Sequence, residues 1–336
     1  MKILLSSYAF YPNIGGIESV SELLAAEFVR LGHEVRIMTQ TPGADREGWG
    51  FEVLRKPSAR ELFQAVRWCD VFFHNNISLQ SLWPLLLVRR PWVVVHQTWI
   101  TRLDRSLAWQ DHLKRFLLRG ATNVSISRAV AESIPVTSQI IPNPYRDDLY
   151  YRMPEVAREK DLVFLGRLVS DKGADLLLEA VKLLREGGLA PGLTIIGSGP
   201  EEAALKALAQ TLGVAEQIDF VGPKSGAELA RILNAHRVMV VPSRWAEPFG
   251  IVALEGIACG CVAVGSQEGG LPDAIGPCGA TFPNGNAPAL AAAIRETLTR
   301  AGRLEQLQAG APEHLARHTA HAVATAYLEI FHRALR

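Results

Sequence analysis

Short apolar runs alternate with amphipathic segments along most of the chain. Runs rich in Val, Ile and Leu, such as Leu193–Ile196 and Val238–Val241, are typical of strands buried on both faces of a parallel sheet. Between such runs, apolar residues recur every three or four positions, as in Gly16–Leu31 and Ala174–Arg185, which predicts helices. The alternation of strands and helices predicts an α/β protein with doubly wound parallel sheets.

The first part of the chain carries one complete set of these elements. The predicted strands are Lys2–Ser6, Glu34–Thr39, Phe51–Leu54, Asp70–His74, Trp92–His96, Asn123–Ser127 and Gln139–Ile141. The predicted helices are Gly16–Leu31, Ala59–Trp68, Leu79–Val88, Leu107–Leu118 and Ala129–Ile134. A polar segment without periodicity follows, from Asn143 to Lys160, and it carries Pro144 and Pro154.

The pattern then restarts. The predicted strands are Leu162–Leu165, Leu193–Ile196, Ile218–Val221, Val238–Val241 and Val262–Val264. The predicted helices are Ala174–Arg185, Glu201–Leu212, Gly226–Ala235, Gly250–Cys259, Ala287–Thr299 and Thr319–Leu335. We therefore expect two Rossmann-like domains, residues 1–145 and 146–318, with a last helix at about 319–336 that is able to pack back on the first domain. Ligands of such sheets lie beyond the carboxyl ends of the strands, so we expect the site in the cleft between the two domains.

Charge and cysteine content narrow the class of protein. The 336 residues carry a net charge of +1, which argues against a general nucleic-acid binder. The four cysteines lack metal-ligand spacing, which predicts reduced thiols in a reducing compartment. The N-terminus becomes polar too early for a signal peptide, and no apolar run reaches the roughly 18 residues of a membrane span. The expected location is the cytoplasm.

The stretch from Pro242 to Gly260 combines a strand end, a loop and a helix. Glu247 lies in the loop, and Glu255 falls inside the apolar stripe of the helix, where a carboxylate is costly unless a partner satisfies it. Glu255 is therefore either a structural acid or an acceptor for ligand hydroxyls. The amides of Phe249, Gly250 and Ile251 stand at the helix start, where an anion is favoured.

Other loops also follow predicted strand ends. Gly15 and Gly16 precede the first helix, so backbone there can approach a ligand or simply turn. His96 ends a strand and is either a site residue or a hydrogen-bonded structural histidine. Gly197 lies in a Gly-Ser-Gly-Pro turn that is mostly structural in character, because no third glycine follows.

Two cations surround the strand–helix turn that begins at Gly166. Arg167 and Lys172 are five residues apart, and such a pair can converge on one diphosphate. The alternative is a pair of ordinary surface charges.

Together these loops resemble the nucleotide-sugar-binding half of the retaining glycosyltransferases of family 4. The resemblance is carried by the runs Phe164-Leu-Gly-Arg-Leu168 with Lys172-Gly173, Ile196-Gly-Ser-Gly-Pro200, Val221-Gly222, Pro242-Ser-Arg-Trp-Ala-Glu-Pro-Phe-Gly250 with Glu255 and Gly260, and Gly269-Gly-Leu-Pro-Asp273. It extends to Gly15-Gly16 and His96 and is weaker in residues 40–140. The family implies the GT-B fold, in which two Rossmann-like domains face a cleft.

The resemblance also implies roles for matching positions. The catalytic set is Glu247, Arg167, Lys172 and His96. The substrate-binding set is Gly15, Gly16, Gly166, Phe249, Gly250, Ile251, Glu255, Asn143 and Gly197. In this assignment Arg167 and Lys172 hold the donor diphosphate, Glu247 accepts from sugar hydroxyls and Glu255 binds the ribose.

The implied reaction is transfer of a sugar, with hexosyl transfer favoured, from a UDP-, GDP- or ADP-sugar to an acceptor hydroxyl. Configuration is retained, and neither a cofactor nor a metal is needed, because cations and helix ends stabilise the leaving diphosphate. The acceptor is a glycan, a lipid or a small molecule. Two alternatives stay open: a nucleotide-sugar epimerase of the same architecture, and a non-catalytic sugar-nucleotide binding protein.

A basic and aromatic region lies on the acceptor side of the chain. It includes Arg89 and Arg90, the segment from Trp99 to Arg105, and the predicted helix with Lys114, Arg115 and Arg119. Such a face can rest on anionic lipid at the inner face of a membrane or bind an anionic acceptor. The alternative is a solvated helix that packs by its apolar side.

Overall fold

The computed structural model describes residues 1–13, 15–100 and 107–336. The chain divides into two compact units. The first comprises residues 1–144 together with 318–336, and the second comprises residues 145–317. These boundaries fall one residue before the expected ones, and each unit is described by itself.

The first unit is built on a parallel sheet in the order β3-β2-β1-β4-β5-β6-β7. Its strands are β1 Lys2–Ser7, β2 Glu34–Thr39, β3 Glu52–Arg55, β4 Val71–Asn75, β5 Trp92–His96, β6 Thr122–Ser125 and β7 Gln139–Ile140. Its helices are α1 Gly16–Arg30, α2 Ala59–Trp68, α3 Leu79–Leu82, α4 Trp109–Leu117, α5 Arg128–Ser133 and α14 Ala320–Ala334, with 3₁₀ turns η1 Trp83–Leu86 and η2 Leu118–Gly120. Helices cover both faces of the sheet, so the apolar runs of β1, β4 and β5 are completely buried.

The second unit contains a parallel sheet in the order β10-β9-β8-β11-β12-β13. Its strands are β8 Lys160–Leu165, β9 Leu193–Ile196, β10 Ile218–Gly222, β11 His236–Val241, β12 Val262–Ser266 and β13 Gly279–Phe282. Its helices are α6 Ala174–Glu186, α7 Glu202–Thr211, α8 Gly226–Asn234, α9 Ile251–Ala258, α10 Leu271–Ile275, α11 Ala287–Thr299, α12 Arg303–Gln308 and α13 Ala311–Ala316, with 3₁₀ turns η3 Ser170–Lys172 and η4 Ala215–Gln217. Apolar side chains of β8, β9 and β11 pack against α6 and α11 to form its core.

Both sheets follow the same winding. In each, the first strand lies at the centre, the next two extend to one side and the later strands extend to the other. The strand order therefore reverses between β1 and β4 in the first unit and between β8 and β11 in the second, which are the positions where such sheets bind ligands. The predicted doubly wound α/β class is confirmed.

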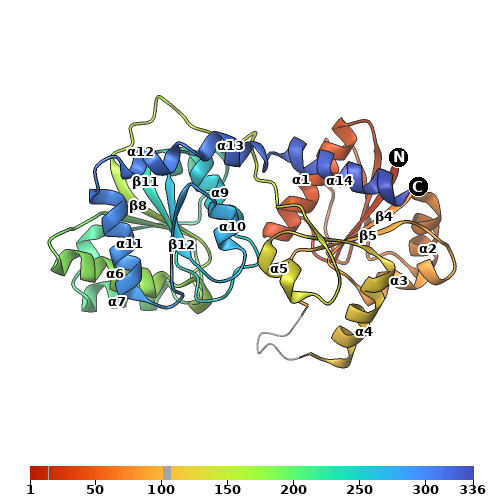
Figure 1. Ribbon diagram of the computed structural model, residues 1–336, viewed down its shortest axis with the longest axis horizontal. Helices are drawn as coiled ribbons and strands as arrows, with labels where there is room; N and C mark the ends of the chain where they lie inside the picture. The colour runs from red at the N-terminus through yellow and green to blue at the C-terminus, as the bar shows by residue number, and fades with distance from the viewer. Residues whose placement is uncertain (14, 101–106) are drawn as a thin grey trace. The chain divides into compact units, whose positions relative to one another are not determined.

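The C-terminal helix completes the core of the first unit. Figure 1 shows α14 running beside α1. The Phe331 ring lies 5.6 Å from that of Phe28 and 5.2 Å from that of Phe73, measured between centroids. Because these rings are buried, the last helix is held to the N-terminal sheet by apolar packing.

Local sequence explains where several elements begin and break. Helix α2 begins at the predicted residue because Ser58 and Glu61 form a capping box. The predicted helix Leu79–Val88 is wrong, since it divides into α3 and the 3₁₀ turn η1. Pro84 has no N–H to continue the α-helical ladder, so the chain tightens at that point. Strand β13 was not predicted, because Gly-Ala-Thr-Phe is not an unbroken apolar run and only its last residue is buried.

The four cysteines are unpaired and buried, as predicted for reduced thiols. Within the described part of the chain, none of the helices has the length and apolar content needed to cross a membrane.

Candidate functional site

Two loops of the second unit meet where its strand order reverses. One loop follows β8 and contains Arg167 and η3, and the other follows β11 and contains Glu247. The Arg244 amide donates to the Asp171 carbonyl at 2.9 Å, which joins the loops through their backbones. Gly173 has a φ of +69°, and a Cβ there would lie only 2.1 Å from the Pro242 carbonyl oxygen. Only glycine therefore allows the two loops to pack this closely.

An ion pair connects these loops through their side chains. Lys172 Nζ lies 2.5 Å from Glu247 Oε1, and the side chains are 24% and 12% exposed. Ser243 Oγ donates to the same oxygen at 2.7 Å. Both of these bonds go to Oε1. No described residue donates to the second carboxylate oxygen, Glu247 Oε2, so this oxygen can accept from a ligand hydroxyl. The structure thus brings together two of the four predicted catalytic residues.

A third loop, after β12, fixes the backbone of Glu247. The Gly270 amide donates to the Glu247 carbonyl at 2.7 Å, and Glu247 forms a parallel bridge with Gly269. Gly269 has a φ of +82°, and a Cβ there would lie 2.3 Å from the Glu247 carbonyl oxygen. Glu247, in the loop after β11, is therefore held by its side chain to the loop after β8 and by its backbone to the loop after β12.

Ser243 and Asn284 support the site and were not predicted from the sequence. Asn284 Nδ2 donates to the Ser243 carbonyl at 3.1 Å, and Asn284 Oδ1 accepts from the Glu268 amide at 3.0 Å. Ser266 Oγ also donates to the Ser243 carbonyl, at 2.7 Å. The Pro-Ser pair before the loop was the only local signal for Ser243, and Asn284 lies 41 residues away in sequence.

Helix α9 begins directly after this loop. Its N-cap is Gly250, with a φ of 104°, and no side chain caps the helix. A Cβ at Gly250 would lie 2.5 Å from Leu271 Cδ1, so the close turn requires glycine. The amide of Ile251 stands in the first turn, where the helix dipole favours an anion. Phe249 is buried, so its side chain anchors the turn.

Glu255 lies one helical turn further along α9. Burial raises the pKa of its carboxyl to about 8, and the nearby Arg146 acts in the opposite direction. Arg146 itself forms a two-bond ion pair with Asp148, at 2.8 Å for each bond. Among the described residues no cation forms an ion pair with this carboxyl, in keeping with the sequence argument that its position is costly.

The turn after β8 presents a cation, and its Gly166 packs against Gly197 of the turn after β9. Arg167 is exposed, and no ion pair joins its guanidinium to another described side chain. Gly197 has a φ of +139°, and a Cβ there would lie 1.9 Å from the Gly166 carbonyl oxygen. Glycine is thus needed at position 197, where the turns after β8 and β9 cross. This agrees with the interpretation of the Gly-Ser-Gly-Pro turn as mostly structural. A substrate contact at Gly166 or Gly197 stays a prediction.

Two predicted residues of the first unit are buried among hydrogen-bond partners. His96 is 1% exposed, its Nε2 lies 3.0 Å from Asn123 Oδ1, and burial lowers its pKa. Asn143 donates to Gln97 Oε1 at 2.7 Å. Both side chains act structurally in this arrangement, and their catalytic or binding roles stay predictions.

The paired glycines of the first unit open α1. Gly15 is the N-cap, its backbone is extended, and no side chain caps the helix. A Cβ at Gly15 would lie 2.5 Å from Glu18 Oε2, so the side chain of the first turn crowds this position. Gly16 is exposed. A ligand contact by Gly15 or Gly16 stays a prediction.

The predicted basic helix presents a mixed apolar face. Trp109, Leu113 and Phe116 of α4 are 70%, 39% and 62% exposed, whereas Leu117 packs against a core cluster of the unit. None of the α4 residues is fully buried. Two cations of this helix also have partners within the unit: Arg115 donates to the Ser133 carbonyl, and Lys114 pairs with Asp111 at 3.6 Å.

Of the other basic residues, one is hydrogen-bonded to backbone carbonyls and two are exposed. Arg90 donates to the backbone carbonyls of Val66 and Arg67. Arg89 and Arg119 are exposed, and the Arg119 guanidinium lies 5.4 Å from the centroid of the Phe116 ring. Arg102 and Arg105 lie outside the described residues.

Two doubly wound sheets, with charged loops at the reversal of one of them, define a protein of the GT-B fold. Solved structures agree over nearly the full chain. A glycosyltransferase from Rickettsia africae ESF-5 matches 100% of this chain and 98% of its own, with a TM-score of 0.83 and 16% identity. Anabaena HepE in complex with UDP matches 99% of this chain and 100% of its own, with a TM-score of 0.84 and 18% identity.

The sequence comparisons point to one family of transferases. Residues 152–314, slightly less than half of the chain, match the model of the glycosyl transferases group 1. The D-inositol 3-phosphate glycosyltransferase of Stackebrandtia nassauensis is 38% identical over 169 residues, which are 47% of this chain. The match spans only 38% of that relative's length. The resemblance to group 1 transferases that was drawn from the sequence is confirmed.

Proposed function

We propose that the protein transfers a sugar, hexosyl in the favoured case, from a nucleoside-diphosphate sugar to an acceptor hydroxyl with retention of configuration. The observation that carries the proposal is the Lys172–Glu247 pair, 2.5 Å between Nζ and Oε1, at the strand-order reversal of the second unit. The match of residues 152–314 to the model of the glycosyl transferases group 1 supports it. A nucleoside-diphosphate donor is further supported by the UDP bound in HepE.

The charges of the site suit a diphosphate leaving group. As the bond from the anomeric carbon to the phosphate oxygen breaks, negative charge grows on the phosphate. Arg167, Lys172 and the amino end of α9 would stabilise that charge. Lys172 carries three N–H donors, so it can keep its bond to Glu247 while it donates to a phosphate oxygen. On this basis we propose a reaction that needs no metal ion.

The carboxylates take positioning roles. Glu247 Oε2 would accept from a hydroxyl of the donor sugar, and Glu255 would accept from the ribose. The acceptor oxygen attacks the anomeric carbon on the face that the phosphate leaves, and a departing phosphate oxygen takes the acceptor proton. This scheme forms one glycosidic bond and breaks one without a carboxylate nucleophile, unlike the two-carboxylate scheme of glycosidases.

Donor turnover tests the proposal and separates it from its alternatives. The protein is incubated with UDP-, GDP- and ADP-sugars, and chromatography and proton NMR identify the nucleotide, the sugar and its anomer. A transferase releases nucleotide and a sugar of retained configuration, at a rate that an acceptor increases. Release of a sugar epimerised within its ring would indicate an epimerase, and saturable binding without turnover would indicate a binding protein; either result contradicts the proposal.

We further propose that α4 contacts the surface of an anionic membrane. Trp109, Leu113 and Phe116 lie at helical spacing and are exposed together, while Arg119 lies beside Phe116. An exposed aromatic face beside cations is typical of helices that lie in the lipid interface. Apolar contact, more than charge, would hold the helix there, because Lys114 and Arg115 are engaged within the unit.

Vesicle pelleting tests this contact. The protein is centrifuged with phosphatidylcholine vesicles and with vesicles that also contain phosphatidylglycerol. We expect stronger pelleting with the anionic vesicles, a loss of it in Trp109→Ser/Phe116→Ser, and no change in the control Tyr151→Ser, whose ring is 53% exposed in the other unit. Equal pelleting of the double variant and the control would contradict the proposal.

A further inference from the structure

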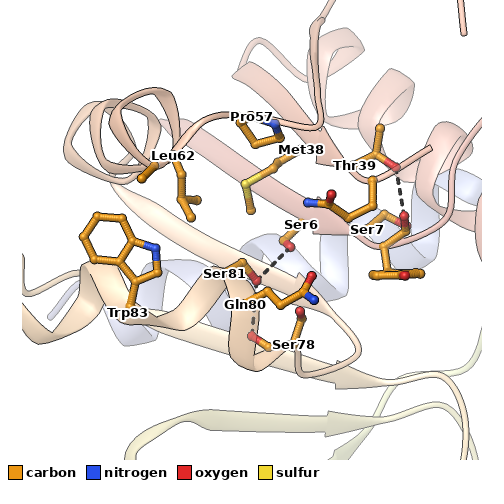
Figure 2. A pocket seen from close by; sticks show the side chains of 13 residues that line it. Ser6, Ser7, Met38, Thr39, Pro57, Leu62, Ser78, Gln80, Ser81 and Trp83 are labelled. Carbon is orange, nitrogen blue, oxygen red and sulfur yellow. Dashed lines mark hydrogen bonds between the residues drawn. The ribbon is translucent and has the colours of Figure 1, made fainter. Parts of the chain in front are cut away.

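The first unit contains a cavity of about 230 Å³ at the carboxyl edge of its sheet. Its walls come from the ends of β1 and β2, the start of α2, and the segment that includes α3 and Trp83 (Figure 2). The volume is below the roughly 300–1,000 Å³ of pockets for drug-sized ligands. The cavity therefore fits a single small ring better than an extended molecule.

A chain of hydrogen bonds fixes the hydroxyls on the cavity floor. Trp92 Nε1, which can only donate, donates to His74 Nδ1 at 2.8 Å. His74 Nε2 must then carry the proton, and it donates to Ser81 Oγ at 2.8 Å. Burial lowers the pKa of His74 to about 3, so the ring stays neutral and this direction holds at ordinary pH. Figure 2 shows the next bonds, from Ser81 to the Ser78 carbonyl and from Ser6 to Ser81.

This chain of bonds decides what the cavity offers to a ligand. The Ser81 hydroxyl accepts from His74 and donates to a carbonyl, so it is occupied. Ser6 donates to Ser81 at 3.5 Å, which leaves the lone pairs of Ser6 Oγ as acceptors. The side-chain amides of Gln40 and Gln80 have no partner among the described residues, and each offers both a donor and an acceptor. Groups of this kind suit the hydroxyls of a ligand, which both donate and accept.

None of the 13 lining residues, all of which are described, is charged. A phosphate or carboxylate would find no cation there, and an ammonium group would find no carboxylate. Trp83 forms one wall, and its ring is stacked on Phe63 with 6.2 Å between centroids and 9° between planes. A fixed aromatic ring packs well against the C–H groups of a saturated ring.

A second cavity in the same unit differs in character. It measures about 140 Å³, and Asp111 and Lys114 are among its lining residues. The smaller cavity therefore has less room for a ligand. It also has a charged wall, in which these two side chains pair with each other. The neutral cavity is the better candidate for a ring that carries only hydroxyls.

We propose that the neutral cavity binds the acceptor, and that the part of the acceptor held there is an uncharged polyhydroxylated ring, a monosaccharide or cyclitol unit. The assignment rests on the proposed sugar transfer. It predicts that phosphorylated rings are excluded from this cavity, because each phosphate would lose its hydration without gaining a cation.

Ligand-detected NMR tests the proposal on the full chain. The probes are glucose, galactose, mannose and myo-inositol, together with glucose 6-phosphate as the charged counterpart of glucose. We expect saturation transfer to at least one neutral ring and weaker transfer to glucose 6-phosphate. In Gln80→Ala the Kd should rise by about fivefold, the equivalent of one lost hydrogen bond. The matched control is Gln210→Ala, an exposed glutamine of α7 in the other unit.

Each outcome decides the proposal. Binding of a neutral ring that Gln80→Ala weakens and Gln210→Ala does not supports it. Binding only of glucose 6-phosphate, equal binding by both variants, or no binding of any neutral ring overturns it. Binding of UDP, GDP and ADP to the same samples is measured separately by calorimetry. If at least one of these nucleotides binds while the neutral rings do not, the cavity assignment fails and the transferase proposal stands. If none of the three nucleotides binds, the transferase proposal fails.

Discussion

The two sheets share one winding, and their carboxyl edges differ in chemistry. In the second unit, the loops after β8, β11 and β12 are tied by backbone bonds and close glycine contacts around a Lys172–Glu247 pair. In the first unit, the corresponding edge contains a neutral cavity whose floor is ordered by His74 and Ser81. A common fold thus fixes where ligands bind, while the side chains at the strand ends determine which ligands those are.

The largest effect on turnover is expected from substitutions at the charged edge, by which we mean the Lys172–Glu247 pair at the carboxyl edge of the second sheet. Lys172→Ala removes a cation from the proposed diphosphate site and leaves a largely buried Glu247 without its partner, so turnover should fall by about 10²–10³-fold. Glu247→Ala should also reduce turnover strongly. Steady-state kinetics with a verified donor measures both effects, and circular dichroism checks that the fold is intact.

The matched control for this prediction is Lys182→Ala. Lys182 lies in the same unit and pairs with Glu186 across one exposed helical turn. Its replacement should leave turnover unchanged. Full activity of Lys172→Ala would contradict the assignment of the charged edge as a donor site.

A second expected effect is on stability, through the close contact between the turns after β8 and β9 in the second unit. Gly197→Ala places a Cβ against the Gly166 carbonyl in a backbone conformation that alanine rarely adopts. We expect the free energy of unfolding to fall by about 1–3 kcal/mol, as measured by urea denaturation. Gly192→Ala serves as the control, because no atom lies within 4 Å of its added Cβ. Equal stability of the two variants would show that the turns are not rigidly packed.

A third expected effect is a pH dependence from Glu255, which is spread over several pH units. Its folded pKa of about 8 lies above the ordinary glutamate value of about 4.3, so the folded state holds a proton that the unfolded state releases. Stability should therefore fall as pH rises from about 4.3 to about 8, by up to about 1.4 kcal/mol per pH unit. Glu255→Gln should remove this slope in denaturation curves recorded across the range. The account would be wrong if the variant kept the slope of the wild type.

Sequence patterns were sufficient for most of the fold. Strands such as β9 were predicted to the residue, because a strand buried on both faces must be an unbroken apolar run. The break at Pro84 and the short strand β13 were missed, since one depends on a local loss of a hydrogen bond and the other on pairing with β12. The two readings of the helix α4 could not be separated from the sequence, because amphipathic spacing has the same form whichever face packs.

The candidate sites were predictable to different degrees. Lys172 and Glu247 were identified because charged residues in glycine-rich strand-end loops have a recognisable spacing. The cavity of the first unit has no such pattern, since Ser6, Gln40 and Gln80 are ordinary polar residues that only the strand order brings together. His74 was read simply as the end of a strand, and its role on the cavity floor depends on partners at Ser81 and Trp92.

Calorimetric titration of the nucleotides with the full chain, in the presence of EDTA, tests the central claim most directly. The claim is that the Lys172–Glu247 edge binds a nucleoside diphosphate without a metal. We predict that at least one of UDP, GDP and ADP binds saturably, at least about tenfold more weakly to Lys172→Ala, and with unchanged affinity to Lys182→Ala. Absence of binding for all three nucleotides, or equal affinity for the wild type and Lys172→Ala, would contradict the claim.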